Sequence, residues 1–254
     1  MKLSVGLLTV IAIAFIIFPG LYKPTVNAEQ LQPKALYQKA DLKNGALLYD
    51  NWLEITNAKP EGNHPLYPNE AQKNGKTTWR CKECHGWDYI GDQGRYRKGS
   101  HYTGIKGVYD ARSQDHELLY SSLTNSDAKH DFSAYLSASQ LRSLVKFLRE
   151  GQADISLVLD NQGKATGNAV NGKVLFDAQC SSCHGSDGND LDFNNNKEGI
   201  QGVGWLANEN PQESIHKIRW GHPGSNMPSM IVDSKLSEQD AIDILTFSQE
   251  LGSR

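Results

Sequence analysis

The sequence has no excess of positive charge, few cysteines and only one long hydrophobic run. Its 254 residues hold 26 Lys and Arg against 29 Asp and Glu, which argues against a basic surface that binds nucleic acid. No segment after the N-terminal run is apolar enough to span a membrane. With 38% apolar residues and 23 glycines, the composition is neither disordered nor collagenous, and is typical of a globular protein of one or two domains.

The hydrophobic run at the N-terminus is typical of an export signal. Lys2 supplies a positive charge, residues 3–18 are almost all apolar, and Val26-Asn27-Ala28 offers a cleavage site. An uncleaved anchor is the alternative, but sixteen apolar residues are fewer than the roughly 18 to 20 that a membrane span needs. We therefore expect residues 1–28 to be a cleaved signal peptide and the mature protein to be periplasmic.

All four cysteines fall into two copies of one motif. The chain reads CKECH at 81–85 and CSSCH at 180–184, and no cysteine is left over. Cys-x-x-Cys-His is the attachment signature of c-type haem, in which both thiols bond to the porphyrin and the adjacent His ligates the iron. The sequence therefore predicts two covalently bound haem c groups, with attachment through Cys81, Cys84, Cys180 and Cys183 and with His85 and His184 as axial ligands.

A zinc site and a redox dithiol are the other uses of such cysteine pairs. Zinc ligation by both pairs is disfavoured because they lie about a hundred residues apart and each has its own adjacent His. A thioredoxin-like dithiol needs a βαβ context, which this Gly- and Asn-rich sequence does not show. Haem attachment remains the favoured prediction.

The two motifs lie within a longer internal repeat. Residues 44–52 read NGALLYDNW and residues 171–179 read NGKVLFDAQ, with apolar residues at helical spacing in both. From Gly45 to the first motif is 36 positions, whereas from Gly172 to the second is 8. The first copy therefore carries an insertion of about 28 residues, roughly 53–79, whose Pro, Asn and Gly content predicts a surface loop.

Each copy of the repeat closes with a helix signal. Ser137 with Gln140, and Ser237 with Asp240, match the capping box that starts a helix, and an apolar stripe follows each. We therefore predict a mainly α protein with a helical domain at 29–150, a linker at 151–167 and a second helical domain at 168–254.

The two motifs and the segment HKIRWGHPGSNMPSM at 216–230 resemble the class I dihaem c-type cytochromes. The resemblance covers nearly all of the mature chain and is looser over 53–79. It implies two tandem class I cytochrome c domains that transfer electrons, with a distal iron ligand on the loop before the last helix. In the second domain the family pattern of Met followed by Pro implies Met227, with Met230, His222 and an open site as the alternatives.

The first domain has no methionine, so its distal ligand must be of another kind. A Gly-Ile-x-Gly-Val segment recurs at 104–108 and 199–203, and His130 stands 23 positions after Gly107, close to the 25 between Gly202 and Met227. Spacing favours His130 and leaves His101, His116, His64 and an open iron as alternatives. A His/His haem has a lower reduction potential than a His/Met haem, which predicts electron entry at the first domain and exit from the second.

Two classes of function are compatible with these features. The favoured one is an electron carrier, or the electron-transfer subunit of an oxidoreductase, with redox proteins as donor and acceptor. The alternative is a haem oxidoreductase that acts on a small inorganic substrate at an open or labile first iron, although no spare cysteine is present to act as a thiolate ligand. We expect no nucleic-acid partner, and membrane contact only if the signal segment stays attached.

The two predicted domains differ in net charge. Residues 29–150 hold 17 Lys and Arg against 15 Asp and Glu, a net +2, whereas residues 151–254 hold 7 against 14, a net −7. Such an asymmetry steers two different partners to two faces, although a plain solvated surface accounts for it equally well. Some basic residues of the first domain, among them Arg80 and Lys82, are expected to pair with haem propionates.

Overall fold

The computed structural model describes residues 33–193 and 199–252, and these residues fold into helices joined by loops. The strands in this part of the chain are two residues long: β1 (Thr124–Asn125) pairs antiparallel with β2 (His130–Asp131). The prediction of a mainly α protein is therefore confirmed. The predicted signal peptide at 1–28 lies outside the described residues. No helix within the described ranges is long and apolar enough to cross a membrane.

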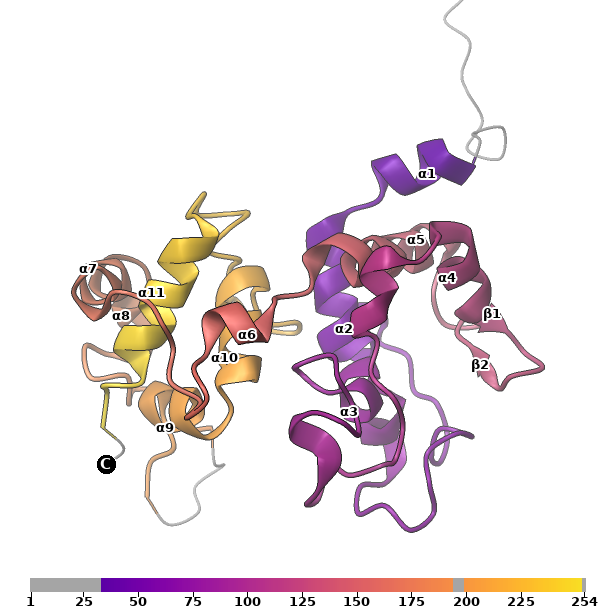
Figure 1. Cartoon of the computed structure of the whole chain (residues 1–254), viewed down its shortest axis with the longest axis horizontal. Helices are drawn as coiled ribbons and strands as arrows, with labels where there is room; N and C mark the ends of the chain where they lie inside the picture. Colours follow the sequence, from indigo (N-terminus) through magenta and orange to yellow (C-terminus); the bar gives the residue numbers. More distant parts are fainter. Residues whose placement is uncertain (1–32, 194–198, 253–254) are drawn as a thin grey trace, which may run out of the picture.

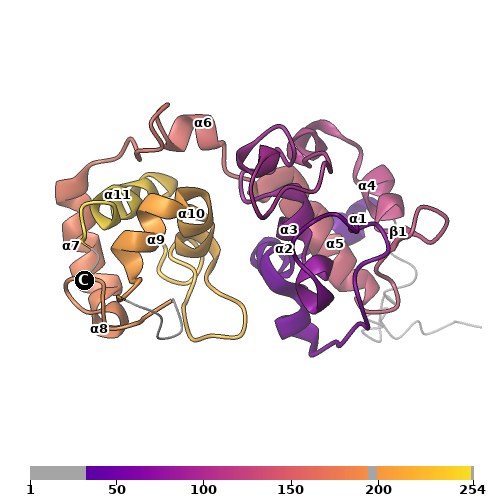
Figure 2. The same cartoon turned by 90° about the horizontal axis from the view of Figure 1, so that it is seen from below.

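The helices form two groups, which lie side by side in Figure 1. We call them the first unit and the second unit. The first unit contains α1 (Pro33–Lys39), α2 (Leu42–Thr56), η2 (Gly75–Trp79), α3 (Cys81–His85), η3 (Arg95–Arg97), η4 (Tyr109–Ser113), α4 (His116–Ser122), β1, β2, α5 (Ala138–Lys146) and η5 (Phe147–Gly151). The second unit contains α7 (Ala169–Gln179), α8 (Ser181–His184), α9 (Val203–Glu209), α10 (Pro211–Trp220) and α11 (Glu238–Ser248). The short helix α6 (Ile155–Val158) lies in the connection between them, at the top of Figure 2.

Both units are built on a close contact between a first and a last helix. In the first unit α2 crosses α5 at Gly45, where an added Cβ would lie 1.9 Å from the carbonyl oxygen of Ser143. In the second unit α7 crosses α11 at Gly172, where an added Cβ would lie 1.9 Å from the carbonyl oxygen of Asp243. Only glycine lets the two backbones approach this closely. The two glycines that align in the sequence therefore occupy equivalent places in the two units.

The last helix of each unit starts with the predicted cap. The hydroxyl of Ser137 accepts a hydrogen bond from the backbone N–H of Gln140, whose side chain accepts one from the backbone N–H of Ser137. Ser237 and Asp240 form the same reciprocal pair at the start of α11. The two capping boxes are confirmed, and each satisfies two backbone donors at a helix start.

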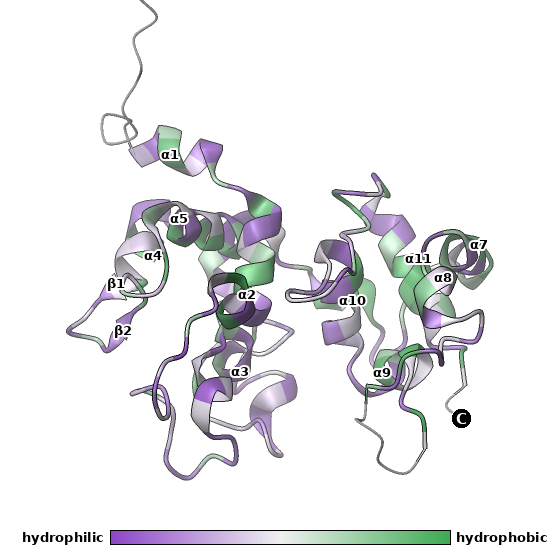
Figure 3. Cartoon of the chain, turned by 180° about the vertical axis from the view of Figure 1, so that it is seen from behind, coloured by the Kyte–Doolittle hydropathy of each residue, from purple (hydrophilic) through white to green (hydrophobic). Residues whose placement is uncertain are grey.

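The apolar side chains gather between the helices of each unit, as the green segments of α2, α5 and α11 show in Figure 3. Trp52, Tyr49 and Phe147 are fully buried in the first unit, and Phe176 and Ile244 are fully buried in the second. Trp220, at the end of α10 in the second unit, belongs to the apolar cluster of the first. The two units therefore share a packed interface.

The segment at 53–79 is mostly exposed or half-buried, but it is not only a surface loop. It is mostly coil, but His64, Tyr67 and Trp79 are all buried. The ring of His64 stacks on Phe132 at 5.6 Å and meets the edge of Trp79 at 4.7 Å. Composition predicted irregular backbone correctly, but these rings pack against residues distant in the sequence, which a local pattern does not reveal.

Candidate functional site

The first motif is a single helical turn. Cys81 begins α3, Cys84 follows one turn later, and no disulfide joins them. Burial raises the pKa of each thiol to about 12. Gly86 ends the turn with φ of 80°, which favours glycine, and Gly185 ends the second motif in the same way with φ of 78°.

The structure brings His85 together with His130. The Nδ1 atom of His85 lies 2.8 Å from the carbonyl oxygen of Lys106, and the Nδ1 atom of His130 lies 2.9 Å from that of Ser122. A carbonyl accepts hydrogen bonds, so each Nδ1 carries a proton and each Nε2 is free to ligate a metal. Burial lowers the pKa of His85 to about 4, which keeps its imidazole neutral.

The separation of these two rings fits one iron between them. Their centroids are 6.3 Å apart. A ligating imidazole nitrogen lies about 2 Å from its metal, so two imidazoles on opposite sides of one ion have centroids about 6 Å apart. The hairpin of β1 and β2 supplies His130, with His130 opposite Asn125 in its register.

The other histidines of the first unit have different partners. His101 contacts the carboxylate of Glu83 at 2.7 Å, and His116 contacts that of Glu117 at 2.8 Å. His64 lies near the pair, with its centroid 6.2 Å from that of His130. However, its Nδ1 accepts a hydrogen bond from the backbone N–H of Leu66, which places its proton on Nε2 and makes that atom a donor rather than a ligand.

The second motif forms the same single helical turn as the first, but its residues are more exposed to solvent. Burial raises the pKa of Cys180 to about 11, while Cys183 is exposed. His184 is half-buried, burial lowers its pKa, and its Nδ1 has no hydrogen-bond partner among the described residues. Leu191 and Phe193 follow the motif with 45% and 39% of their surface exposed. Apolar side chains left uncovered beside a reactive motif are typical of a surface that a large apolar group covers.

The two methionines of the second unit occupy different environments. Met230 is 3% exposed and lies in the apolar core of the unit. Met227 is half-buried on the loop between α10 and α11, where its backbone N–H donates to the hydroxyl of Ser225. The third candidate, His222, accepts a hydrogen bond at Nδ1 from the ammonium of Lys217 at 2.7 Å, so its Nε2 carries the proton.

The described residues fit a haem at the first motif. Tyr67 and Tyr96 hold their hydroxyls buried, with no hydrogen-bond partner in the described part of the chain. Buried donors of this kind need an acceptor, and the carboxylates of haem are suitable ones. Two of the basic side chains expected to fill that role are engaged elsewhere: Arg80 pairs with Asp50 at 2.6 Å and Lys82 with Glu83 at 2.9 Å.

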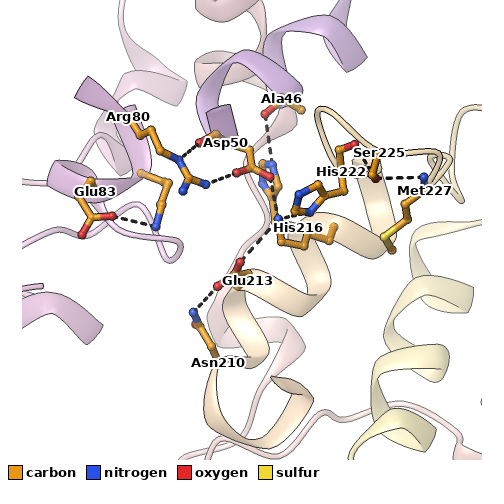
Figure 4. A network of polar contacts seen from close by, with 12 residues as sticks. Ala46, Asp50, Arg80, Glu83, Asn210, Glu213, His216, His222, Ser225 and Met227 are labelled. Atoms are coloured by element: carbon orange, nitrogen blue, oxygen red, sulfur yellow. Dashed lines mark hydrogen bonds and ion pairs between the residues drawn. The ribbon is translucent and has the colours of Figure 1, made fainter. Parts of the chain in front are cut away.

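Sequence reasoning missed a buried polar network between the two units, which Figure 4 shows. His216 of α10 is fully buried, with Nδ1 3.2 Å from the hydroxyl of Tyr89 and Nε2 3.2 Å from the carbonyl oxygen of Ala46. The neighbouring Lys217 binds the carboxylate of Asp50 at 2.9 Å. The sequence offered little warning of it beyond His216, Lys217 and Arg219 within four positions of one helix.

Comparison with known families gives a match that lies within the second unit. Residues 169–251 match the family model for cytochrome c, a domain that carries covalently bound haem c and transfers electrons. No curated protein matches the chain. The match supports a c-type cytochrome, and it spans α7 to α11 with the CSSCH motif and Met227 inside it.

Proposed function

We propose that the chain is a dihaem c-type cytochrome, which passes single electrons between two redox proteins in the periplasm after removal of residues 1–28. Its first domain, 29–150, would hold one haem, and its second domain, 168–254, the other. The first haem would be bound through Cys81, Cys84, His85 and His130, and the second through Cys180, Cys183, His184 and Met227.

The pairing of His85 with His130 is the observation that carries this proposal. Both imidazoles are fixed at Nδ1 by a backbone carbonyl, and their centroids stand 6.3 Å apart. Two preoriented imidazoles at this separation would hold one iron between them, which would leave no position for a substrate. This favours electron transfer over the alternative of a haem oxidoreductase.

Haem supplies a reversible one-electron couple at its iron, tuned by the axial ligands. The chain's part is to hold those ligands and keep the pocket dry. His85 and His130 are held by backbone carbonyls, so neither ring turns freely. Phe132 and His64 pack beside His130 with centroids 5.1 Å and 6.2 Å away, which supports its ring from that side.

For the second haem, the different environments of the two methionines support Met227 as the proposed ligand. Met230 is buried in the core, where it fills apolar space. Met227 lies half-buried on the loop before α11 and inside the cytochrome c match. A neutral thioether favours ferrous iron, so this site would have the higher potential.

Optical spectra of the purified holoprotein and of His130→Ala test the proposal. We expect two haems per chain, both low-spin, one with a methionine-to-iron band in its ferric form, and no response of the reduced protein to carbon monoxide. His130→Ala should turn one haem high-spin and make it bind carbon monoxide, while the methionine band stays. His101→Ala is the matched control and should leave both spectra unchanged. One haem per chain, or an unchanged spectrum in His130→Ala, would overturn the proposed ligand set.

A further inference from the structure

A buried carboxylate joins the two units. Asp50 of α2 is fully buried, and its two carboxylate oxygens bind cations from different units: Arg80 at 2.6 Å and Lys217 of α10 at 2.9 Å. Burial alone would raise the pKa of Asp50, but the ammonium of Lys217 and the guanidinium of Arg80 hold it below its usual range. Asp50 is therefore charged, and both of its cations are held in place.

The backbone of α2 is shaped around this contact. Helical geometry is interrupted at Asn51, which has φ of −157° and ψ of 80°. The carbonyl of Asp50 instead accepts a hydrogen bond from Nε of Arg80 at 2.8 Å. A side chain that inserts at a helix break satisfies a carbonyl that the helix leaves free. Arg80 immediately precedes Cys81, so the break fixes Asp50 to the start of the first haem motif.

From Asp50 the contacts continue to the Met227 loop, which we define as residues 221–228. The ammonium of Lys217 donates to Nδ1 of His222 at 2.7 Å. The backbone N–H of His222 donates to the carbonyl of Met227 at 3.3 Å, and the hydroxyl of Ser225 donates to the carbonyl of His222 at 3.0 Å. Lys217 thus holds the base of the loop that carries the proposed iron ligand. Figure 4 labels His222, Ser225 and Met227 on this loop.

The tip of the Met227 loop also rests on the first unit. Gly224 has φ of 76°, and a Cβ added there would lie 3.3 Å from the Cβ of Glu54 on α2. At the base of the loop, a Cβ added at Gly221 would lie 2.7 Å from the carbonyl oxygen of Met227. The loop therefore packs against its own backbone at its base and against α2 at its tip.

We infer that Asp50 is a positioning residue for the distal ligand of the second haem: through Lys217 and His222, the first unit holds the Met227 loop in its ligating place. The inference rests on the proposed function for the identity of the ligand. It means that the methionine ligation and the reduction potential of the second haem depend on a side chain of the first unit.

The internal repeat provides a matched control. Asp177 of α7 aligns with Asp50 in the sequence repeat, but it is exposed and pairs with Lys173 of its own helix at 2.7 Å. An exposed pair of this kind contributes little to stability. Asp177→Asn therefore makes the same chemical change as Asp50→Asn without touching the interface.

The test compares full-length holoproteins carrying Asp50→Asn and Asp177→Asn. Asp50→Asn should weaken or abolish the methionine-to-iron band and lower the potential of the second haem, while the bis-imidazole spectrum of the first haem stays. Asp177→Asn should retain the wild-type band and potential. An intact band and potential in a folded Asp50→Asn protein would overturn the inference.

A second variant keeps the test decisive if Asp50→Asn does not fold. His222→Ala removes an exposed side chain and leaves the buried pair of Asp50 and Lys217 in place. It should also weaken the methionine band, and an unchanged band would count against the inference. If the wild-type protein itself lacks the band, the proposed ligand fails first, so the two failures are distinguishable.

Discussion

At the scale of single residues, hydrogen-bond partners sort four of the histidines into two classes. The Nδ1 atoms of His85 and His130 face carbonyl oxygens, which leaves Nε2 free for a metal. In His64 and His222 the Nδ1 atom accepts a hydrogen bond, so Nε2 carries the proton. Sequence spacing singled out His130, and its ring lies 6.3 Å from that of His85, which is an independent reason for it.

His216 belongs to neither class, because both of its nitrogens bind protein groups in the interface. Burial lowers its pKa to about 3, so the folded protein keeps it neutral. The unfolded chain takes up the proton near pH 6.5, hence the stability this histidine contributes is present above that pH and is lost as pH falls toward 3. Between pH 7 and pH 4 we expect a loss of about 3 kcal/mol from this group.

Chemical denaturation of the wild type and of His216→Gln at pH 7 and pH 4 measures this loss. The glutamine variant removes the titrating group, so its free energy of unfolding should fall less between the two pH values. His101→Gln serves as the control, because His101 lies outside the interface. Equal pH dependence in wild type and His216→Gln would show that His216 does not govern the acid sensitivity.

At the scale of elements, the repeated helix crossing makes the two glycines sensitive to substitution. Gly172→Ala would drive a methyl group against the carbonyl of Asp243, where the two backbones touch. Overpacking of this kind costs about 1–3 kcal/mol. We expect Gly172→Ala to lower the free energy of unfolding by about that amount, measured by denaturant titration.

Lys173→Ala is the control for the glycine, because Lys173 is the next residue of α7 and its side chain is 57% exposed. Its loss should change the unfolding free energy by less than about 0.5 kcal/mol. If the two variants have the same free energy of unfolding, the close crossing of α7 and α11 does not stabilise the second unit.

Local signals predicted the elements well and their mutual packing poorly. Ser137 and Ser237 start helices as predicted, because a cap is a contact between residues three positions apart. The burial of His64 depends on Phe132, and that of Asp50 on Lys217, which are 68 and 167 positions distant. No pattern of spacing contains such contacts, so the site around His130 was partly predictable and the interface was not.

At the scale of the whole molecule, the two units are held together by charged as well as apolar contacts. Arg219 of α10 donates to the carbonyl of Gly151 at 2.8 Å, and Lys43 of α2 binds Asp233 at 2.5 Å. With Asp50 and Lys217, these contacts span the interface from several elements. Such contacts would keep the distance between the two proposed haems constant, which would suit transfer within one molecule.

The proposed ligand sets predict the direction of that transfer. Two imidazoles stabilise ferric iron more than an imidazole and a thioether do, so the first haem should have the lower potential, by an amount on the order of 0.1 V. A redox titration followed optically should show two steps. The methionine-to-iron band belongs to the ferric form of the second haem and should disappear in the step at higher potential.

Met227→His gives the second haem two imidazoles and should bring the steps together. If the band disappears in the lower step, electrons cannot run downhill from the first unit to the second, and the proposed order of donor and acceptor must be reversed.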